Sequence, residues 1–178
     1  ICYWNIGKAD KISTPVVRDF ASLKLTGNGL LANQNSCLTP YGDGVFISQT
    51  RANGGNTTGV PSILYIDKDG NLTYSSGGDA NIPSSGGGLA ISADGSRMAV
   101  AGAKLNIRLF NVAWSGNTPF LNLVMEIPGS ANTANNEVPQ LAFDTAGNIL
   151  AIHRSTTLAN DGLHAFAIPG EQRPVSVP

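Results

Sequence analysis

A short pattern of leucine and glycine recurs three times along this chain. Residues 38–44 read LTPYGDG, residues 89–95 read LAISADG and residues 141–147 read LAFDTAG, so that successive glycines are 51 and 52 positions apart. A second apolar run follows each glycine, beginning at Val45, Met98 and Ile149. Two apolar runs around a glycine-containing turn indicate a β-hairpin, because glycine adopts a positive φ without a steric penalty. The repetition therefore predicts an array of similar β units.

Two further apolar runs are expected after each hairpin. The third-strand runs are 63–67 (ILYID), 107–112 (IRLFNV) and 163–168 (LHAFAI), and 1–6 (ICYWNI) fits the same template. Trp4, Phe110 and Phe166 share one position of that template, and alternate residues of a strand share one face, which predicts a common buried face. Fourth strands are expected at 16–20, 71–75 and 123–127, with a weaker candidate at 175–177.

These runs divide the chain into units of four antiparallel strands. Residues 1–29 form the second half of one unit, and three further units cover 30–76, 77–129 and 130–178. A β-sandwich or jelly roll also consists of many short strands and is the alternative.

Two stretches of the repeat resemble known families. ISADGSRMAVAG at 91–102, followed by IRLFNV, resembles the WD40-like and YVTN-type blades of bacterial β-propellers, and VPQLAFDTAGNILAI at 138–152 resembles NHL and gluconolactonase-type blades. Phe110-Asn111 and Trp4-Asn5 stand where a strict WD40 repeat has Trp-Asp. The resemblance covers nearly the whole chain and implies an all-β protein with about three and a half four-stranded blades in an incomplete ring.

The first unit lacks its first two strands. Because a propeller closes its ring to protect the edges of its sheets, we expect this chain to be the C-terminal part of a larger propeller. Either the remaining blades of that parent protein or a second copy of the chain would then cover the open blade faces.

Composition excludes some classes of partner. The net charge is -1, with 11 basic and 12 acidic residues, so no basic stripe is available for nucleic acid, and no apolar run is long enough to span a membrane. The abundance of Gly, Asn, Ser and Thr is typical of extracellular, cell-surface or periplasmic proteins. Cys2 and Cys37 would allow one disulfide, but we favour two separate buried thiols.

The longer predicted connections gather at one end of the units. They span 49–61, 76–87, 129–138 and 153–162. Long loops on a rigid scaffold often bind ligands, although plain solvated connectors explain their composition equally well. The candidate anchors for a polar partner in these loops are Arg51, Glu137, His153 and Arg154. Tyr41 and Trp114 would either stack on a sugar or peptide or pack between blades.

The best enzymatic interpretation is a metal-dependent, lactonase-like hydrolase. The residues just before the repeated leucines are Cys37, Gly88 and Gln140, none of which is a carboxylate or His, so its metal ligands would lie largely outside this segment. Asp67 and Asp69 slightly resemble a calcium loop, but a hairpin turn explains them too. We predict no catalytic residue, metal site or cofactor, and favour a non-enzymatic module that binds a protein or a glycan.

Overall fold

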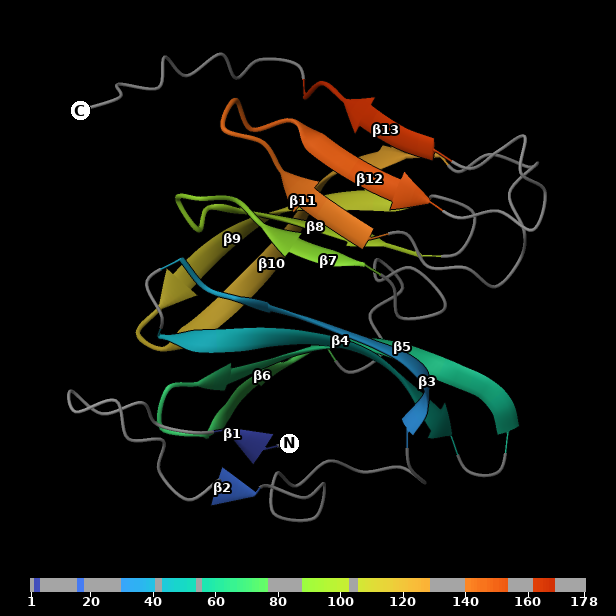
Figure 1. Ribbon diagram of the computed structural model, residues 1–178. Coiled ribbons are helices and arrows are strands. Elements are labelled where there is room, and N and C mark those ends of the chain that lie inside the picture. Colours follow the sequence, from blue (N-terminus) through green and yellow to red (C-terminus); the bar gives the residue numbers. More distant parts are fainter. Residues whose placement is uncertain are drawn as a thin grey trace.

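The computed structural model describes residues 2–3, 16–17, 30–40, 43–53, 56–76, 88–102, 106–128, 140–153 and 162–168. These residues contain strands and turns and no helix, so the chain is all-β, as the sequence predicts. The strands form four antiparallel sheets that follow one another along the chain (Figure 1).

The sheets are simple meanders of consecutive strands. A small sheet pairs β1 (Cys2–Tyr3) with β2 (Val16–Val17). The first large sheet has the order β3 (Leu30–Leu38), β4 (Gly44–Asn53), β5 (Asn56–Asp67) and β6 (Leu72–Ser75). The second has the order β7 (Leu89–Ile91), β8 (Arg97–Ala101), β9 (Ile107–Ser115) and β10 (Thr118–Ile127). The third consists of β11 (Gln140–Phe143), β12 (Ile149–His153) and β13 (Gly162–Phe166).

The three large sheets stack as layers, with the second sheet in the middle (Figure 1). Their first strands are neighbours, because β7 lies against both β3 and β11, and the fourth strands β6 and β10 also touch. The stack of described sheets does not close on itself. A two-layer sandwich has no sheet covered on both faces, whereas the second sheet buries side chains on both of its faces.

Alternation of side chains gives each of the three large sheets two apolar faces. We call the face that a sheet turns toward the next sheet in the chain its forward face, and the opposite one its rear face. The forward face of the first sheet meets the rear face of the second in one core cluster, which contains Phe46, Ile63, Tyr65, Met98, Val100 and Phe110. The forward face of the second sheet meets the rear face of the third in another, which contains Ala99, Ala101, Ile107, Leu109, Ile149 and Ala151.

The shared aromatic position of the third strands is confirmed at two of its three members. Phe110 pairs with Met98, and Phe166 pairs with Ile149, so both rings lie on the rear faces of their sheets. Phe110 belongs to the first core cluster, and Phe166 packs against the second. The side chain of Trp4 lies outside the described residues.

The alignment of the first hairpin with the other two is wrong by two residues. Gly95 and Gly147 have φ values of 70° and 83°, as a turn glycine should. Gly44, in contrast, is the first residue of β4 and pairs with Asp67. A Cβ at Gly44 would overlap the ring and hydroxyl of Tyr65 and the carbonyl of Ile66, so close approach explains this glycine. The last pairs before the turns are Leu38 with Val45, Ile91 with Met98 and Phe143 with Ile149.

A second correction concerns residues 49–61, which the sequence analysis treated as a loop. β4 continues to Asn53 and β5 begins at Asn56, so most of this segment is a long hairpin. Backbone hydrogen bonding between antiparallel strands does not require apolar side chains, which is why the polar composition was misleading.

The stack predicts that aromatic residues on β9 and β10 differ in their contribution to stability. Phe110→Ala removes a fully buried ring between two sheets and should lower the free energy of unfolding by about 3–5 kcal/mol. Phe120→Ala removes a half-exposed ring from β10 and should change it by less than about 1 kcal/mol. Urea denaturation of both variants measures the difference; equal losses would contradict burial of Phe110 between the sheets.

Candidate functional site

The structure places two of the four candidate binding residues. Arg51 lies in β4, where it pairs with Leu30 on one side and Val60 on the other, and not in a connecting loop. His153 is the last residue of β12 and pairs with Gly162. Glu137 and Arg154, like Tyr41, lie outside the described residues. Arg51 and His153 therefore belong to the first and third sheets, and the second sheet lies between them.

The meander order sorts the connections between strands into two ends. The ends of the strands that flank the turns between first and second strands, and between third and fourth strands, lie at one end, which we call the short-turn end. The strand ends at Asn53, Asn56, Ser75, Leu89, Ala101, Ile107, Ile127, Gln140, His153 and Gly162 lie at the other, which we call the long-connection end after the connections that the sequence places between them. Arg51 and His153 stand near or at the carboxyl ends of second strands, which point to the long-connection end.

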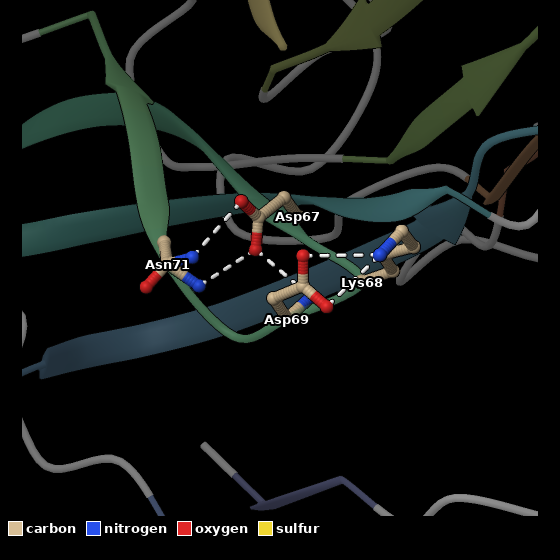
Figure 2. A network of polar contacts seen from close by, with 4 residues as sticks. All are labelled: Asp67, Lys68, Asp69 and Asn71. Carbon is tan, nitrogen blue, oxygen red and sulfur yellow. Dashed lines mark hydrogen bonds and ion pairs between the residues drawn. The ribbon is translucent and has the colours of Figure 1, made fainter.

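The most elaborate polar network at the short-turn end surrounds Asp67 (Figure 2). Asp67 Oδ1 accepts hydrogen bonds from the backbone N–H groups of Asp69 at 3.0 Å and Asn71 at 2.8 Å. Asp67 Oδ2 accepts a third from Asn71 Nδ2 at 3.2 Å. The exposed Lys68 and Asp69 form an ion pair at 2.9 Å. The carboxylate of Asp67 thus closes the β5–β6 hairpin, which confirms the hairpin-turn interpretation of this segment.

The same turn occurs in the third sheet at Asp144. Asp144 Oδ1 accepts from the backbone N–H groups of Ala146 at 2.9 Å and Asn148 at 2.8 Å, and Oδ2 accepts from Asn148 Nδ2 at 2.8 Å. Gly70 and Gly147, the fourth residues of the two turns, both have a φ of 83°. The common sequence is Asp-x-x-Gly-Asn, a signal that the sequence analysis passed over because the two copies occupy different turns of their units.

Hydrogen bonding controls the ionisation of both carboxylates. At Asp67 desolvation raises the pKa, but the hydrogen bonds from Asn71 and Asp69 and the charge of Lys68 outweigh it, so that the pKa lies below its ordinary value. At Asp144 the hydrogen bonds from the side chain and backbone of Asn148 lower the pKa. Both groups are therefore ionised turn caps at neutral pH.

Hydroxyl groups close the turns of the first and second sheets that precede β4 and β8. Ser92 Oγ donates to Asp94 Oδ1 at 2.7 Å and accepts from the backbone N–H of Arg97 at 3.0 Å. Thr39 Oγ1 likewise donates to Asp43 Oδ1 and accepts from the backbone N–H of Gly44 at 3.2 Å. These hydroxyl and carboxylate groups therefore form hydrogen bonds within their own turns.

Trp114 lies on β9 next to the short-turn end, and it packs between the first two sheets. Its ring meets Tyr65 edge-on with centroids 5.1 Å apart, and its centroid lies 6.1 Å from that of Phe46. The residue remains 39% exposed. Of the two roles that the sequence allows, the structure supports packing between sheets.

Groups suited to metal binding or nucleophilic chemistry are scarce in the described part of the chain. There, no three His, Cys, Asp or Glu side chains gather closely enough to hold a metal ion. The corrected alignment changes one of the first-strand residues considered for metal binding. The equivalent residues are now Ser36, Leu89 and Leu141, and the residues just before them are Asn35, Gly88 and Gln140. None of the six is a carboxylate or His. Cys37 is a free thiol on the forward face of the first sheet, where burial raises its pKa to about 12.

The chain matches no protein-family model, no curated protein and no solved structure. None of the described residues forms a helix long and apolar enough to cross a membrane. What the protein does must therefore be inferred from its own residues.

The two Asp-x-x-Gly-Asn turns predict a specific loss of stability in acid. Because their pKa values are lower in the folded than in the unfolded chain, both carboxylates contribute stability above the ordinary Asp pKa, and this contribution is lost as the pH falls through the folded pKa values. A variant with Asp67→Asn and Asp144→Asn keeps an accepting oxygen in each turn but cannot titrate. Urea denaturation from pH 5 to pH 2 should give a flatter pH dependence for this variant than for the unmodified chain; identical slopes would contradict the turn-cap assignment.

Burial of Cys37 predicts that its thiol is alkylated slowly in the folded chain. In a Cys2→Ser background, the rise in the pKa of Cys37 from 9.0 to about 12 should lower its thiolate fraction at pH 8 by about a thousandfold. Because the thiolate that remains is more nucleophilic, alkylation by iodoacetamide should be at least about tenfold slower than in the urea-unfolded chain. Mass spectrometry of timed samples measures both rates. Comparable rates in the folded and unfolded chain would show that this side chain is not enclosed beneath the second sheet.

Proposed function

We propose that this chain is a non-enzymatic β-propeller module, exposed outside the cytoplasm, that binds a protein or a glycan through its long-connection end. The alternation of units in the sequence and the layered sheets support the propeller. In particular, the first strands β3, β7 and β11 lie side by side, as the inner strands of successive blades do around an axis.

The observation that carries the choice of end is the use of polar groups at the short-turn end. The side-chain oxygens of Asp67, Asp144 and Ser92 accept hydrogen bonds from N–H groups of their own turns, at distances of 2.8–3.2 Å. Carboxylate and hydroxyl groups that already cap turns offer little to a ligand. The connections 75–89, 127–140 and 153–162 are longer, and they carry Glu137 and Arg154, with His153 at the strand end beside them.

The positions of Arg51 and His153 fit this proposal. Both belong to second strands, and both stand where those strands approach the long-connection end. A ligand that contacted both would bridge the first and third sheets over the second. A glycan chain or an extended protein segment has the length for such a contact, whereas a compact small molecule does not.

Binding to a printed array of bacterial and host glycans tests the proposal, with pull-down by the immobilised chain as the test for protein ligands. Arg51→Ala and Arg154→Ala should each weaken a reproducible interaction about tenfold, since hydrogen bonds to charged groups contribute about 1.5–3 kcal/mol. Lys68→Ala, which removes an exposed cation at the short-turn end, is the matched control and should leave binding unchanged.

Three results would overturn the proposal. Loss of binding in Lys68→Ala or Trp114→Ala, with binding intact in Arg51→Ala and Arg154→Ala, would place the site at the short-turn end. A stoichiometric metal ion with lactone hydrolysis would favour the hydrolase instead. Electron microscopy of the intact protein without ring-shaped particles would contradict the propeller itself.

A further inference from the structure

Both histidines of this chain stand on the rear face of the third sheet, next to its long-connection end. His164 of β13 pairs with Ala151 of β12, and His153, two residues after Ala151, pairs with Gly162. Ala151 is a fully buried member of the second core cluster and therefore marks the rear face. Because alternate residues of a strand share a face, the register places both histidines on that face.

The imidazole ring of His164 extends toward the position opposite His153. Its Nε2 atom lies 3.7 Å from the place where a Cβ of Gly162 would be. Gly162 is the direct partner of His153, and directly opposite residues of an antiparallel pair have Cβ atoms about 4.5–5.5 Å apart. Nε2 of His164 is thus directed at the space that glycine leaves open beside the backbone of His153.

This nitrogen lacks a hydrogen-bond partner among the described residues, although it is buried. The ring lies nearly parallel to that of Phe166, with an angle of 18° between their planes and centroids 6.4 Å apart. The core cluster that the rear face joins contains only apolar side chains and offers no donor or acceptor from a side chain. A buried polar atom without a partner is costly, and such an atom calls for a specific explanation.

We propose that His153 and His164 together bind a divalent transition-metal ion of the kind that prefers imidazole ligands, such as Zn²⁺, Ni²⁺ or Cu²⁺. The ion would lie beside Gly162, serve as the partner of Nε2 and keep water in its remaining coordination positions. Two histidines four residues apart on a helix, with Cβ atoms about 5–6 Å apart, bind zinc in the same manner.

Such an ion would link β12 and β13 where the two strands enter the long-connection end. Because the two histidines share a face only in the paired register, the ion binds the folded chain more tightly than the unfolded one and stabilises the third sheet. Two protein ligands are fewer than the four of a structural zinc site, so we expect affinity in the micromolar range. The site does not depend on binding of a glycan or protein, and a bound ion without lactone hydrolysis agrees with the proposed function.

Isothermal titration of the 178-residue chain, prepared without a polyhistidine tag, with ZnCl₂ and NiCl₂ tests the proposal. One ion should bind per chain. At a free metal concentration about ten times the Kd, the midpoint of thermal unfolding should rise by about 3–5 °C. His153→Asn and His164→Gln should each weaken binding at least about tenfold, because one imidazole alone loses the advantage of two linked ligands. CaCl₂ should give no binding, since calcium prefers oxygen ligands.

A substitution beside His164 in the sequence but on the opposite face is the matched control. Leu163 and its cross-strand partner Ile152 lie on the forward face, where they are 68% and 61% exposed. Leu163→Asn should therefore bind the metal like the unmodified chain. Cys37 is retained in all variants, so an ion held by thiols would still bind after either histidine is replaced.

Electron paramagnetic resonance of the Cu²⁺ form gives a direct readout of the ligands. The unmodified chain should show coupling to the nitrogens of two imidazoles, and each histidine variant to one at most. Absence of binding at about 1 mM metal, or binding that survives in either histidine variant, would overturn the proposal. Equal loss of binding in Leu163→Asn would also overturn it, because a disturbed sheet would then explain the effect of the histidine substitutions.

Discussion

The structure depends on one constraint: a strand in a stacked sheet must be apolar on both sides, and each side must find another sheet. Ala99 and Met98 are neighbours on β8, yet they belong to two different cores because alternate side chains point to opposite faces. The apolar area that each sheet buries against the next offsets the entropy lost when so many glycine-rich turns are ordered. Hydrogen bonds within a sheet set its register, but the contacts between faces decide how the sheets are arranged.

The periodic part of the fold could be predicted from the sequence, because it rests on patterns that repeat. The strands around Gly95 and Gly147 and the shared position of Phe110 and Phe166 follow from spacing alone. The role of Gly44 could not be predicted from spacing, because a glycine is required there by the close approach of Tyr65 from the neighbouring strand. No local sequence pattern indicates such a contact. The extension of β4 to Asn53 was missed because a polar segment can pair through its backbone as well as an apolar one.

The candidate site was harder to predict, for a physical reason. Whether a polar side chain is free for a ligand depends on its hydrogen-bond partners, and these depend on turn geometry. Asp67 looks like a ligand-binding carboxylate in the sequence but serves, as Asp144 does, as the cap of an Asp-x-x-Gly-Asn turn. Trp114 could stack on a sugar or pack between sheets, and only its contact with Tyr65 from the preceding unit separates the two roles.

The layered arrangement also makes the molecule unequal in its resistance to local opening. To detach the second sheet, the chain must separate two apolar contacts, whereas among the described strands the third sheet packs against one other sheet, through its rear face. Fluctuations that expose backbone amides should therefore begin at β11–β13 and reach β7–β10 only at a higher free-energy cost. A stack of repeats thus has a gradient of rigidity that follows its order along the chain, and any partner that covers the exposed leucine and isoleucine side chains would level that gradient.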